Sequence, residues 1–222
     1  MGSFAAIFDW DGVIIDSSRA HEVAWDRLGA ETGRDLPPGH FKAGFGRKND
    51  HIIPHILKWD VPAEEAARLG RRKEALYRDI LRELGIAPLP GVREFLDRLQ
   101  AAGVPCAVGS STERENIDTI MRIIGFGKYF GTIVAADDVT RGKPDPQVFL
   151  LGAGRLGVAP ARCVVFEDAF AGLEAARAGG MKAVGVATTH PAEKLRPFAD
   201  RVVARLDELA PDDLGRLVTA GA

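Results

Sequence analysis

Residues 4–12 read Phe-Ala-Ala-Ile-Phe-Asp-Trp-Asp-Gly, a short apolar run that ends in two acidic residues and a glycine. An apolar run of this length, bounded by turn residues, indicates a buried β-strand. Asp9 follows the run directly and Asp11 lies two residues further on, so both carboxylates can face one cleft. The motif alone is equally compatible with a solvated turn closed by Gly12. Whether the motif forms a site or a solvated turn depends on which other residues the fold brings beside it.

Further apolar runs alternate with segments in which apolar residues recur at helical spacing. The strand-like runs are 104–108, 132–135, 163–166 and 182–187, and the helical segments are 92–102, 113–124, 146–156 and 170–178. Strands separated by helices of this length form right-handed crossovers and a parallel sheet with helices on both faces. We therefore predict an α/β protein with a Rossmann-like parallel sheet as its core.

One long stretch after the first strand breaks this alternation. It shows helical patterns and no convincing strand, at residues 19–32, 49–57 and 62–84. Turn-rich segments punctuate it, Leu-Pro-Pro-Gly at 36–39 and Ala-Pro-Leu-Pro-Gly at 87–91. We predict a small all-helical domain of residues 17–87, inserted into a core formed by residues 1–16 and 88–222.

The composition is that of a soluble globular protein. Of the 222 residues, 46% are hydrophobic and 27% are charged, and the net charge of -2 gives no support for nucleic-acid or anionic-membrane binding. No run approaches the roughly 20 apolar residues of a membrane helix, and no signal segment is evident. Cys106 and Cys163 lie in strand-like runs without metal-ligand spacing, so we expect buried thiols and a cytoplasmic protein.

Ligands of open parallel sheets bind beyond the carboxyl ends of the strands. The second strand ends in Gly-Ser-Ser-Thr at 109–112. A small hydroxyl beside backbone N–H groups at a helix start is suited to holding a phosphoryl oxygen. Taken alone, the segment is better explained by Thr112 capping the helix that begins near Glu113. The two readings are compatible.

Two other strand ends carry charged residues. In Arg-Gly-Lys-Pro-Asp-Pro at 141–146, prolines restrict the backbone after Lys143, and Asp145 is placed to cap the next helix. A lysine in a loop is usually solvated, but the restricted backbone beside Lys143 indicates that its ammonium neutralises phosphate charge. In Val-Val-Phe-Glu-Asp at 164–168, a buried strand runs into two acids, which repel each other unless a cation lies nearby. Oxygen ligands of this kind favour Mg²⁺, although a solvated strand end is the simpler alternative.

In order and spacing, these four motifs resemble those of the haloacid dehalogenase superfamily of phosphotransferases. The helical insert resembles the cap of its β-phosphoglucomutase-like branch, and the resemblance covers essentially the whole chain. It implies that Asp9 attacks phosphorus and forms an aspartyl-phosphate. Asp11 would protonate the leaving oxygen and later take a proton from the attacking water.

The resemblance also implies how metal and phosphate are bound. Mg²⁺ would be held by an Asp9 oxygen, the Asp11 main-chain carbonyl and Asp168, with Glu167 assisting. The transferring phosphoryl group would be held by Ser110 and Ser111 at one strand end and by Lys143 at another.

Three residues of the insert match the pattern of the β-phosphoglucomutase-like branch. They are His21, Arg47 in a glycine-containing loop, and Lys73. The resemblance implies that they contact the substrate, since a cap that closes on the core contacts the leaving group. The alternatives are that His21 merely covers its helix and that Lys73 pairs with Glu74 on a solvated face.

The expected function is hydrolysis of a small phosphorylated sugar or sugar-like metabolite by a monomeric enzyme. A sugar phosphomutase is the alternative, but Ser-Thr-Glu-Arg-Glu-Asn at 111–116 differs from the short polar run that sugar mutases carry there. Dehalogenation is disfavoured because it needs neither Mg²⁺ nor the second Asp. A non-catalytic binding module is disfavoured because it would not need the four motifs, all of which are present.

A looser resemblance to plant phosphatases of riboflavin biosynthesis rests on residues 133–139, 141–146 and 189–191, and favours phosphatase activity without naming the substrate. Trp10 either fills space or narrows the entrance.

Overall fold

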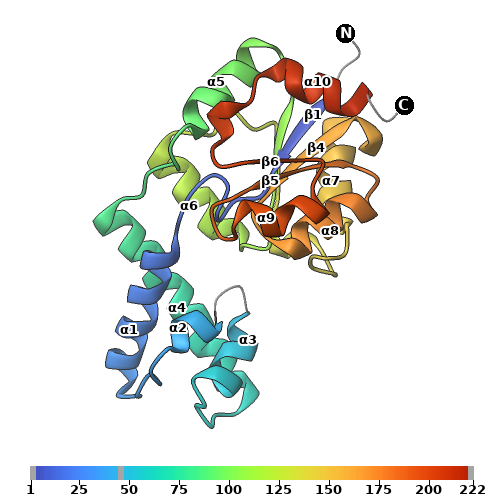
Figure 1. The fold of residues 1–222 in the computed structure, drawn as a ribbon. Coiled ribbons are helices and arrows are strands. Elements are labelled where there is room, and N and C mark those ends of the chain that lie inside the picture. The colour runs from blue at the N-terminus through green and yellow to red at the C-terminus, as the bar shows by residue number, and fades with distance from the viewer. Residues whose placement is uncertain (1–3, 45–47, 220–222) are drawn as a thin grey trace. The chain divides into compact units, whose positions relative to one another are not determined.

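A computed structural model of the chain describes residues 4–44 and 48–219. The chain divides into two compact units. One consists of Met1–Asp16 and Ala87–Ala222, and the other of Ser17–Ile86 (Figure 1). The long unit holds the sheet, and the short unit is helical.

The sheet has six strands in the order β3-β2-β1-β4-β5-β6, and every neighbouring pair is parallel. The strands are β1 (Ala5–Phe8), β2 (Cys106–Gly109), β3 (Thr132–Val134), β4 (Cys163–Glu167), β5 (Lys182–Val186) and β6 (Arg201–Val203). The predicted α/β class and parallel sheet are therefore confirmed. The strand β6 was not predicted, because its short apolar run lies between two arginines, Arg201 and Arg205.

The position of β1 explains why its sequence is apolar throughout. All four of its residues are buried, because β1 lies between β2 and β4 in the middle of the sheet. Phe8 pairs in register with Val108 on one side and Phe166 on the other. The rings of Phe8 and Phe166 stack with centroids 4.6 Å apart. Aromatic contact and burial together hold the ends of β1 and β4 side by side.

Helices cover both faces of the sheet. They are α5 (Val92–Ala101), α6 (Arg114–Ile124), α7 (Gln147–Leu156), α8 (Phe170–Ala178), α9 (Ala192–Leu195) and α10 (Pro211–Thr219). Figure 1 shows α5 and α10 on one side and α7 and α8 on the other. On the α7 and α8 side, Phe149 and Leu173 join a core cluster with Ile7 and Val165 of the sheet. Cys106 and Cys163 are free and buried, as expected.

The helical unit contains α1 (Ser18–Thr32), α2 (His40–Gly44), α3 (Asn49–His51), a π-helix η1 (Ile52–Ile56) and α4 (Ala63–Leu84). Its described residues form no strand. Helices α1 and α4 pack along each other, and Trp25 of α1 is buried with its ring edge against Trp59. Exposed arginine–glutamate pairs such as Arg72 with Glu31 also join α1 to α4, but such pairs add little stability. The unit therefore has an apolar core of its own.

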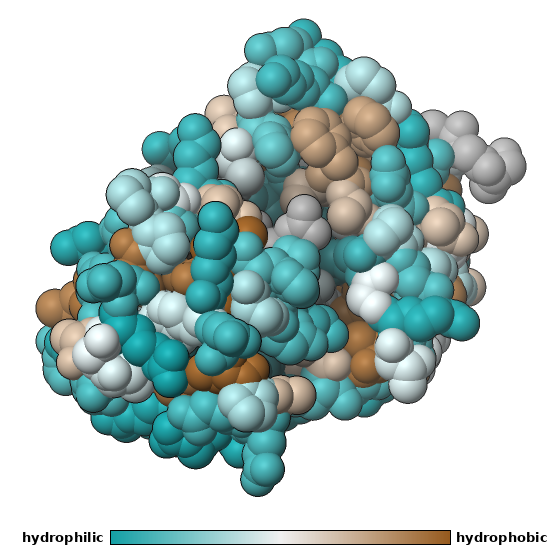
Figure 2. All heavy atoms as spheres, turned by 90° about the horizontal axis from the view of Figure 1, so that it is seen from below, coloured by the Kyte–Doolittle hydropathy of each residue, from teal (hydrophilic) through white to brown (hydrophobic). Residues whose placement is uncertain are grey.

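No helix among residues 4–44 and 48–219 is both long and apolar enough to cross a membrane. The face drawn in Figure 2 is mainly hydrophilic, with apolar residues in several separate places. Among the described residues, the large apolar side chains exposed on the surface are Leu84, Ile123 and Leu150, and scattered apolar residues of this kind are normal.

Candidate active site

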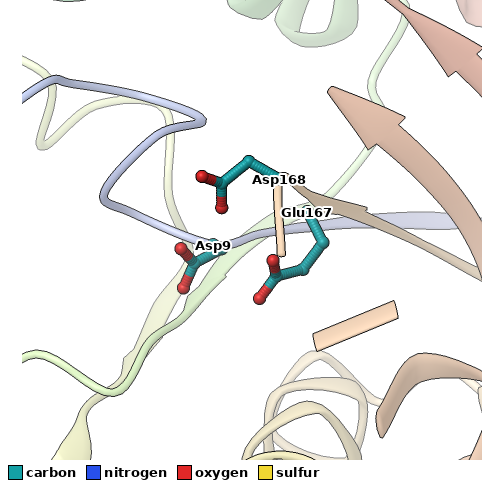
Figure 3. A group of neighbouring side chains, drawn as sticks. All are labelled: Asp9, Glu167 and Asp168. Atoms are coloured by element: carbon teal, nitrogen blue, oxygen red, sulfur yellow. The ribbon is translucent and has the colours of Figure 1, made fainter. Parts of the chain in front are cut away.

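Three carboxylates meet at the carboxyl ends of β1 and β4. Asp9 follows β1, Glu167 ends β4 and Asp168 comes next. All three are buried, and each offers an oxygen within 4.8 Å of the others (Figure 3). The two strands are direct neighbours, with Phe8 opposite Phe166, so the acids that follow them must share one small volume.

Lys143 supplies the opposite charge. Its Nζ lies 2.6 Å from Oδ1 of Asp9 and 2.7 Å from Oε1 of Glu167, and it also lies over the ring of Phe149, 4.8 Å from the centroid. Burial by itself would lower the pKa of Lys143, but the charges of Asp9 and Glu167 outweigh burial and raise it. The lysine therefore stays protonated beside the carboxylates.

One ammonium does not balance three carboxylates. Burial, with the charges of Asp9 and Glu167, raises the pKa of Asp168 to about 8. Burial also raises the pKa of Glu167, which the charge of Lys143 only partly offsets. A divalent cation would relieve this repulsion, and an all-oxygen donor set suits a hard ion such as Mg²⁺. The residues present therefore fit a metal site.

The second acid of the first motif has a different environment. Asp11 is half-buried, and its Oδ2 accepts a hydrogen bond of 2.7 Å from the Thr112 hydroxyl. Thr112 was expected to cap the following helix, and this expectation is wrong. Glu113 is the N-cap residue of α6, and Thr112 instead links the β2 loop to the β1 loop. The Thr112 hydroxyl, expected to cap its own helix, therefore bonds to a residue that is distant in the sequence.

The structure brings the phosphate-binding candidates to the same edge of the sheet. Ser110 follows β2, which neighbours β1, and it is 2% exposed with Oγ accepting the Thr112 N–H at 3.1 Å. Ser111 is exposed. Asp145 accepts the N–H of Gln147, the first residue of α7, so the expected anchoring of that helix by Asp145 is observed.

Sequence reasoning missed two hydroxyls that follow β5. Thr188 donates to the Gly12 carbonyl at 2.5 Å, and Thr189 donates to Oδ2 of Asp168. Their position after a strand could have marked them as site candidates, because ligands of parallel sheets bind at the carboxyl ends of the strands. They were left without a role because the contact they make is visible only in the tertiary structure.

The cap candidates lie in the helical unit. Lys73 is 3% exposed, with Nζ 2.9 Å from Oε1 of Glu74 and 2.6 Å from Nδ1 of His21. Its ammonium also lies over the rings of Trp25 and Tyr77, 5.4 Å from each centroid. Pairing with Glu74 is therefore observed, but on a buried face and not a solvated one. Arg47 lies outside the residues that the structure describes.

Burial and the nearby lysine determine the state of the histidine. Together they lower the pKa of His21 to about 3, and its ring stacks on Tyr77 with centroids 3.9 Å apart. Burial would raise the pKa of Glu74, but Lys73 and His21 outweigh it and lower that pKa to about 2. Because an ammonium can only donate, the neutral His21 accepts at Nδ1 and carries its proton on Nε2.

Trp10 stands between the two acids of the first motif. It is 0% exposed, and its ring packs edge-on against Phe130. A fully buried ring cannot line an entrance. Trp10 therefore fills space inside the sheet unit.

Comparisons with known proteins show what the whole chain is similar to. A family model for haloacid dehalogenase-like hydrolases matches residues 5–180. The chain is 37% identical over 219 residues to the chloroplastic 5-amino-6-(5-phospho-D-ribitylamino)uracil phosphatase of Arabidopsis thaliana, covering 97% of this chain but 58% of the plant protein. It is 36% identical over 182 residues to the fructose-1-phosphate phosphatase YqaB of Escherichia coli (strain K12), covering 81% of this chain and 94% of that protein. The solved structure of β-phosphoglucomutase from Clostridium difficile matches with a TM-score of 0.81 at 27% identity, covering 99% of each chain.

Proposed function

Since this chain belongs to the haloacid dehalogenase-like hydrolase family, we propose that it is a Mg²⁺-dependent phosphatase of small phosphorylated sugars or sugar-like metabolites. The observation that carries the proposal is the buried group of Asp9, Glu167 and Asp168 with Lys143 beside it. Two relatives that are named as phosphatases support the reaction type. The chain spans little more than half of the plant relative, so that relative's activity and substrate are not carried over.

Asp9 is the proposed nucleophile. One of its oxygens attacks phosphorus, the bond from phosphorus to the leaving oxygen breaks, and Asp11 gives its proton to that oxygen. Asp11 then takes a proton from a water molecule, whose oxygen attacks phosphorus as the bond to Asp9 breaks. Inorganic phosphate is released and both carboxylates return to their starting states.

The remaining residues hold charge and position. Asp9, the Asp11 carbonyl and Asp168, with Glu167, would hold Mg²⁺, which when bound offsets charge on the phosphoryl oxygens. Lys143 adds a second positive charge from a buried position. Ser110 and Ser111, which follow β2, would donate hydrogen bonds to the phosphoryl group.

The helical unit is proposed to act as the cap that selects the substrate. His21 and Lys73 would contribute through the buried group they form with Glu74, which fixes the ring and its Nε2 proton. Arg47, which is outside the residues that the structure describes, is proposed to contribute as well. A neutral imidazole that carries its proton on Nε2 is suited to donate to a sugar hydroxyl or phosphate oxygen.

A sugar phosphomutase is the second candidate. The structural match to a β-phosphoglucomutase over 99% of both chains favours it. The polar run at 111–116, which differs from that of sugar mutases, favours hydrolysis. A mutase would have to protect its aspartyl-phosphate from water until a second sugar hydroxyl attacks.

The deciding experiment is ³¹P NMR of the Mg²⁺-loaded protein with a pooled panel of sugar and polyol phosphates. The pool includes β-glucose 1-phosphate with a trace of glucose 1,6-bisphosphate. Growth of the inorganic phosphate signal supports the proposal if Asp9→Asn abolishes it and Asp212→Asn, at an exposed position on α10, leaves it unchanged. A new phosphomonoester without inorganic phosphate would show a mutase, and no Mg²⁺-dependent turnover would reject both.

A further inference from the structure

The loop after β5 ties together two parts of the proposed metal site. Thr188 donates its hydroxyl to the Gly12 carbonyl at 2.5 Å, and the adjacent Thr189 donates to Oδ2 of Asp168. Gly12 belongs to the loop after β1, and Asp168 follows β4. Two consecutive side chains thus connect the first acidic motif with the last one.

The backbone that carries these hydroxyls is itself held in place. The Ala187 N–H donates to the Val203 carbonyl at 2.8 Å, and the Thr188 N–H donates to the Val186 carbonyl at 2.9 Å. After the two threonines, the His190 ring stacks on Phe170 with centroids 4.4 Å apart. The Thr189 hydroxyl is therefore mounted on an anchored loop.

Asp168 is confined from a second direction. A Cβ built on Gly12 would lie 2.1 Å from Oδ2 of Asp168, so the Gly12 backbone approaches this carboxylate closely. Only glycine fits there, and its φ of +80° is one that other residues rarely adopt. The Asp168 carboxylate is 6% exposed and lies between the Gly12 backbone and the Thr189 hydroxyl.

This confinement has a chemical consequence. A hydrogen-bond donor aimed at one carboxylate oxygen favours the ionised form and fixes the plane of the group. A metal needs both, because it binds the ionised carboxylate in a defined direction.

We propose that Thr189 is a positioning residue that orients the Asp168 carboxylate for divalent metal binding, so that its hydroxyl sets the metal affinity of the site. The inference rests on the proposed metal-dependent function, because Asp168 is placed there as a metal ligand. It goes further by assigning the affinity to a residue that does not itself touch the metal. Residues that orient metal ligands in this way typically change affinity 10- to 100-fold when they are removed.

The test is the dissociation constant for Mg²⁺ of the full chain, measured by titration calorimetry in the absence of substrate. Thr189→Val keeps the shape of the side chain and removes the hydroxyl, so we expect Mg²⁺ binding to weaken by roughly 10- to 100-fold. Thr189→Ser restores the donor and should return the affinity to within about 3-fold of wild type. Thr219→Val is the matched control, because it makes the same change at an exposed threonine of α10 whose hydroxyl bonds to the Gly215 carbonyl.

Turnover gives a second readout. If Thr189 only positions a metal ligand, Thr189→Val raises the Mg²⁺ concentration needed for half-maximal activity and leaves the rate at saturating Mg²⁺ close to wild type. Thermal unfolding of each metal-free variant checks that it folds. Thr189→Ala replaces Thr189→Val if the valine is not accommodated.

The outcomes separate this inference from the proposed function. Wild-type Mg²⁺ affinity in Thr189→Val, or equal weakening in Thr219→Val, would overturn the role of Thr189 and leave the phosphatase proposal intact. Absence of Mg²⁺ binding in the wild-type protein would overturn the metal site and the inference with it. Selective weakening in Thr189→Val, rescued by serine, is the result we expect.

Discussion

The Nζ atom of Lys143 lies 2.6 Å from Oδ1 of Asp9, although the two residues are 134 positions apart in the chain. The same ammonium lies 2.7 Å from Glu167. Because Lys143 joins the proposed nucleophile to a proposed metal ligand, its charge acts on both. Each prediction below follows from a contact of this kind.

Removing the charge of Lys143 should impair catalysis. Lys143→Met keeps the length of the stem but leaves the buried carboxylates without their ammonium, so we expect the rate constant for hydrolysis to fall by roughly 100- to 1000-fold. Steady-state kinetics on the substrate found by ³¹P NMR measures this. Lys194→Met, at an exposed lysine, should match wild type. A Lys143→Met enzyme within a few-fold of wild type would rule out the proposed role.

Gly172 is predicted to protect the position of Glu167. A Cβ at Gly172 would lie 1.8 Å from Oε1 of Glu167, whereas a Cβ at Gly154 would meet nothing within 4 Å. Both glycines are in helices, α8 and α7. Gly154→Ala should therefore stabilise the protein by about 0.5–1 kcal/mol.

Gly172→Ala should instead lower both the stability and the Mg²⁺ affinity. Chemical denaturation and titration calorimetry of the two variants measure this difference. Equal stability and equal Mg²⁺ affinity in the two variants would show that Glu167 can move aside without cost.

The hydrogen bond from Thr112 to Asp11 should matter for the rate of the reaction. Thr112→Val removes the donor that holds the proposed acid and base, so we expect kcat to fall about 5- to 10-fold, the usual worth of one such bond. KM should change less, because Asp11 acts on the leaving oxygen. Thr112→Ser keeps the hydroxyl and should recover most of kcat. A loss confined to KM would instead assign Thr112 to substrate binding.

The buried group in the helical unit predicts how stability depends on pH. His21 has a pKa of about 3, below its usual 6.5, so between these values the unfolded chain binds more protons than the folded one. Stability therefore falls as the pH is lowered from about 6.5 towards 3. Glu74, with its pKa lowered to about 2 from 4.5, adds a further loss below pH 4.5.

Urea unfolding between pH 4.5 and 7.5 isolates the histidine contribution. His21→Gln removes the titrating ring from the group formed with Lys73 and Glu74, so the difference in unfolding free energy from wild type should shrink as the pH falls. Thr219→Val, which removes no titrating group from an exposed position on α10, should show a constant difference. A constant difference for His21→Gln would mean that His21 titrates normally in the folded protein.

The sequence predicted the sheet well because its signals are local. Buried strands such as β1 and β4 are continuous apolar runs, and α7 and α8 carry apolar residues at helical spacing. The three-residue β6 was not predicted, and the helix predicted at 49–57 contains a π-helix at Ile52–Ile56 that its pattern did not distinguish from an α-helix. The strand β6 forms because it pairs with β5, a contact that the local sequence does not show.

The proposed site divides in the same way. The sequence by itself placed Asp9, Lys143 and the pair Glu167–Asp168 after strand ends, because parallel strands bring their carboxyl ends to one edge. It could not determine which partner each polar group would choose. Thr112 bonds to Asp11 and not to its own helix, and Thr189 bonds to Asp168.

The burial of charged side chains was equally beyond the sequence. The pattern around Lys73 was compatible with a solvated helix face, yet the residue is 3% exposed. Strand order and packing decide which side chains lose water, and loss of water decides which charges must pair and how far each pKa moves. Residue types and their spacing thus determined the chemistry available to this protein. Only the tertiary structure decided the contacts that tune it, because those contacts join residues that the chain keeps far apart.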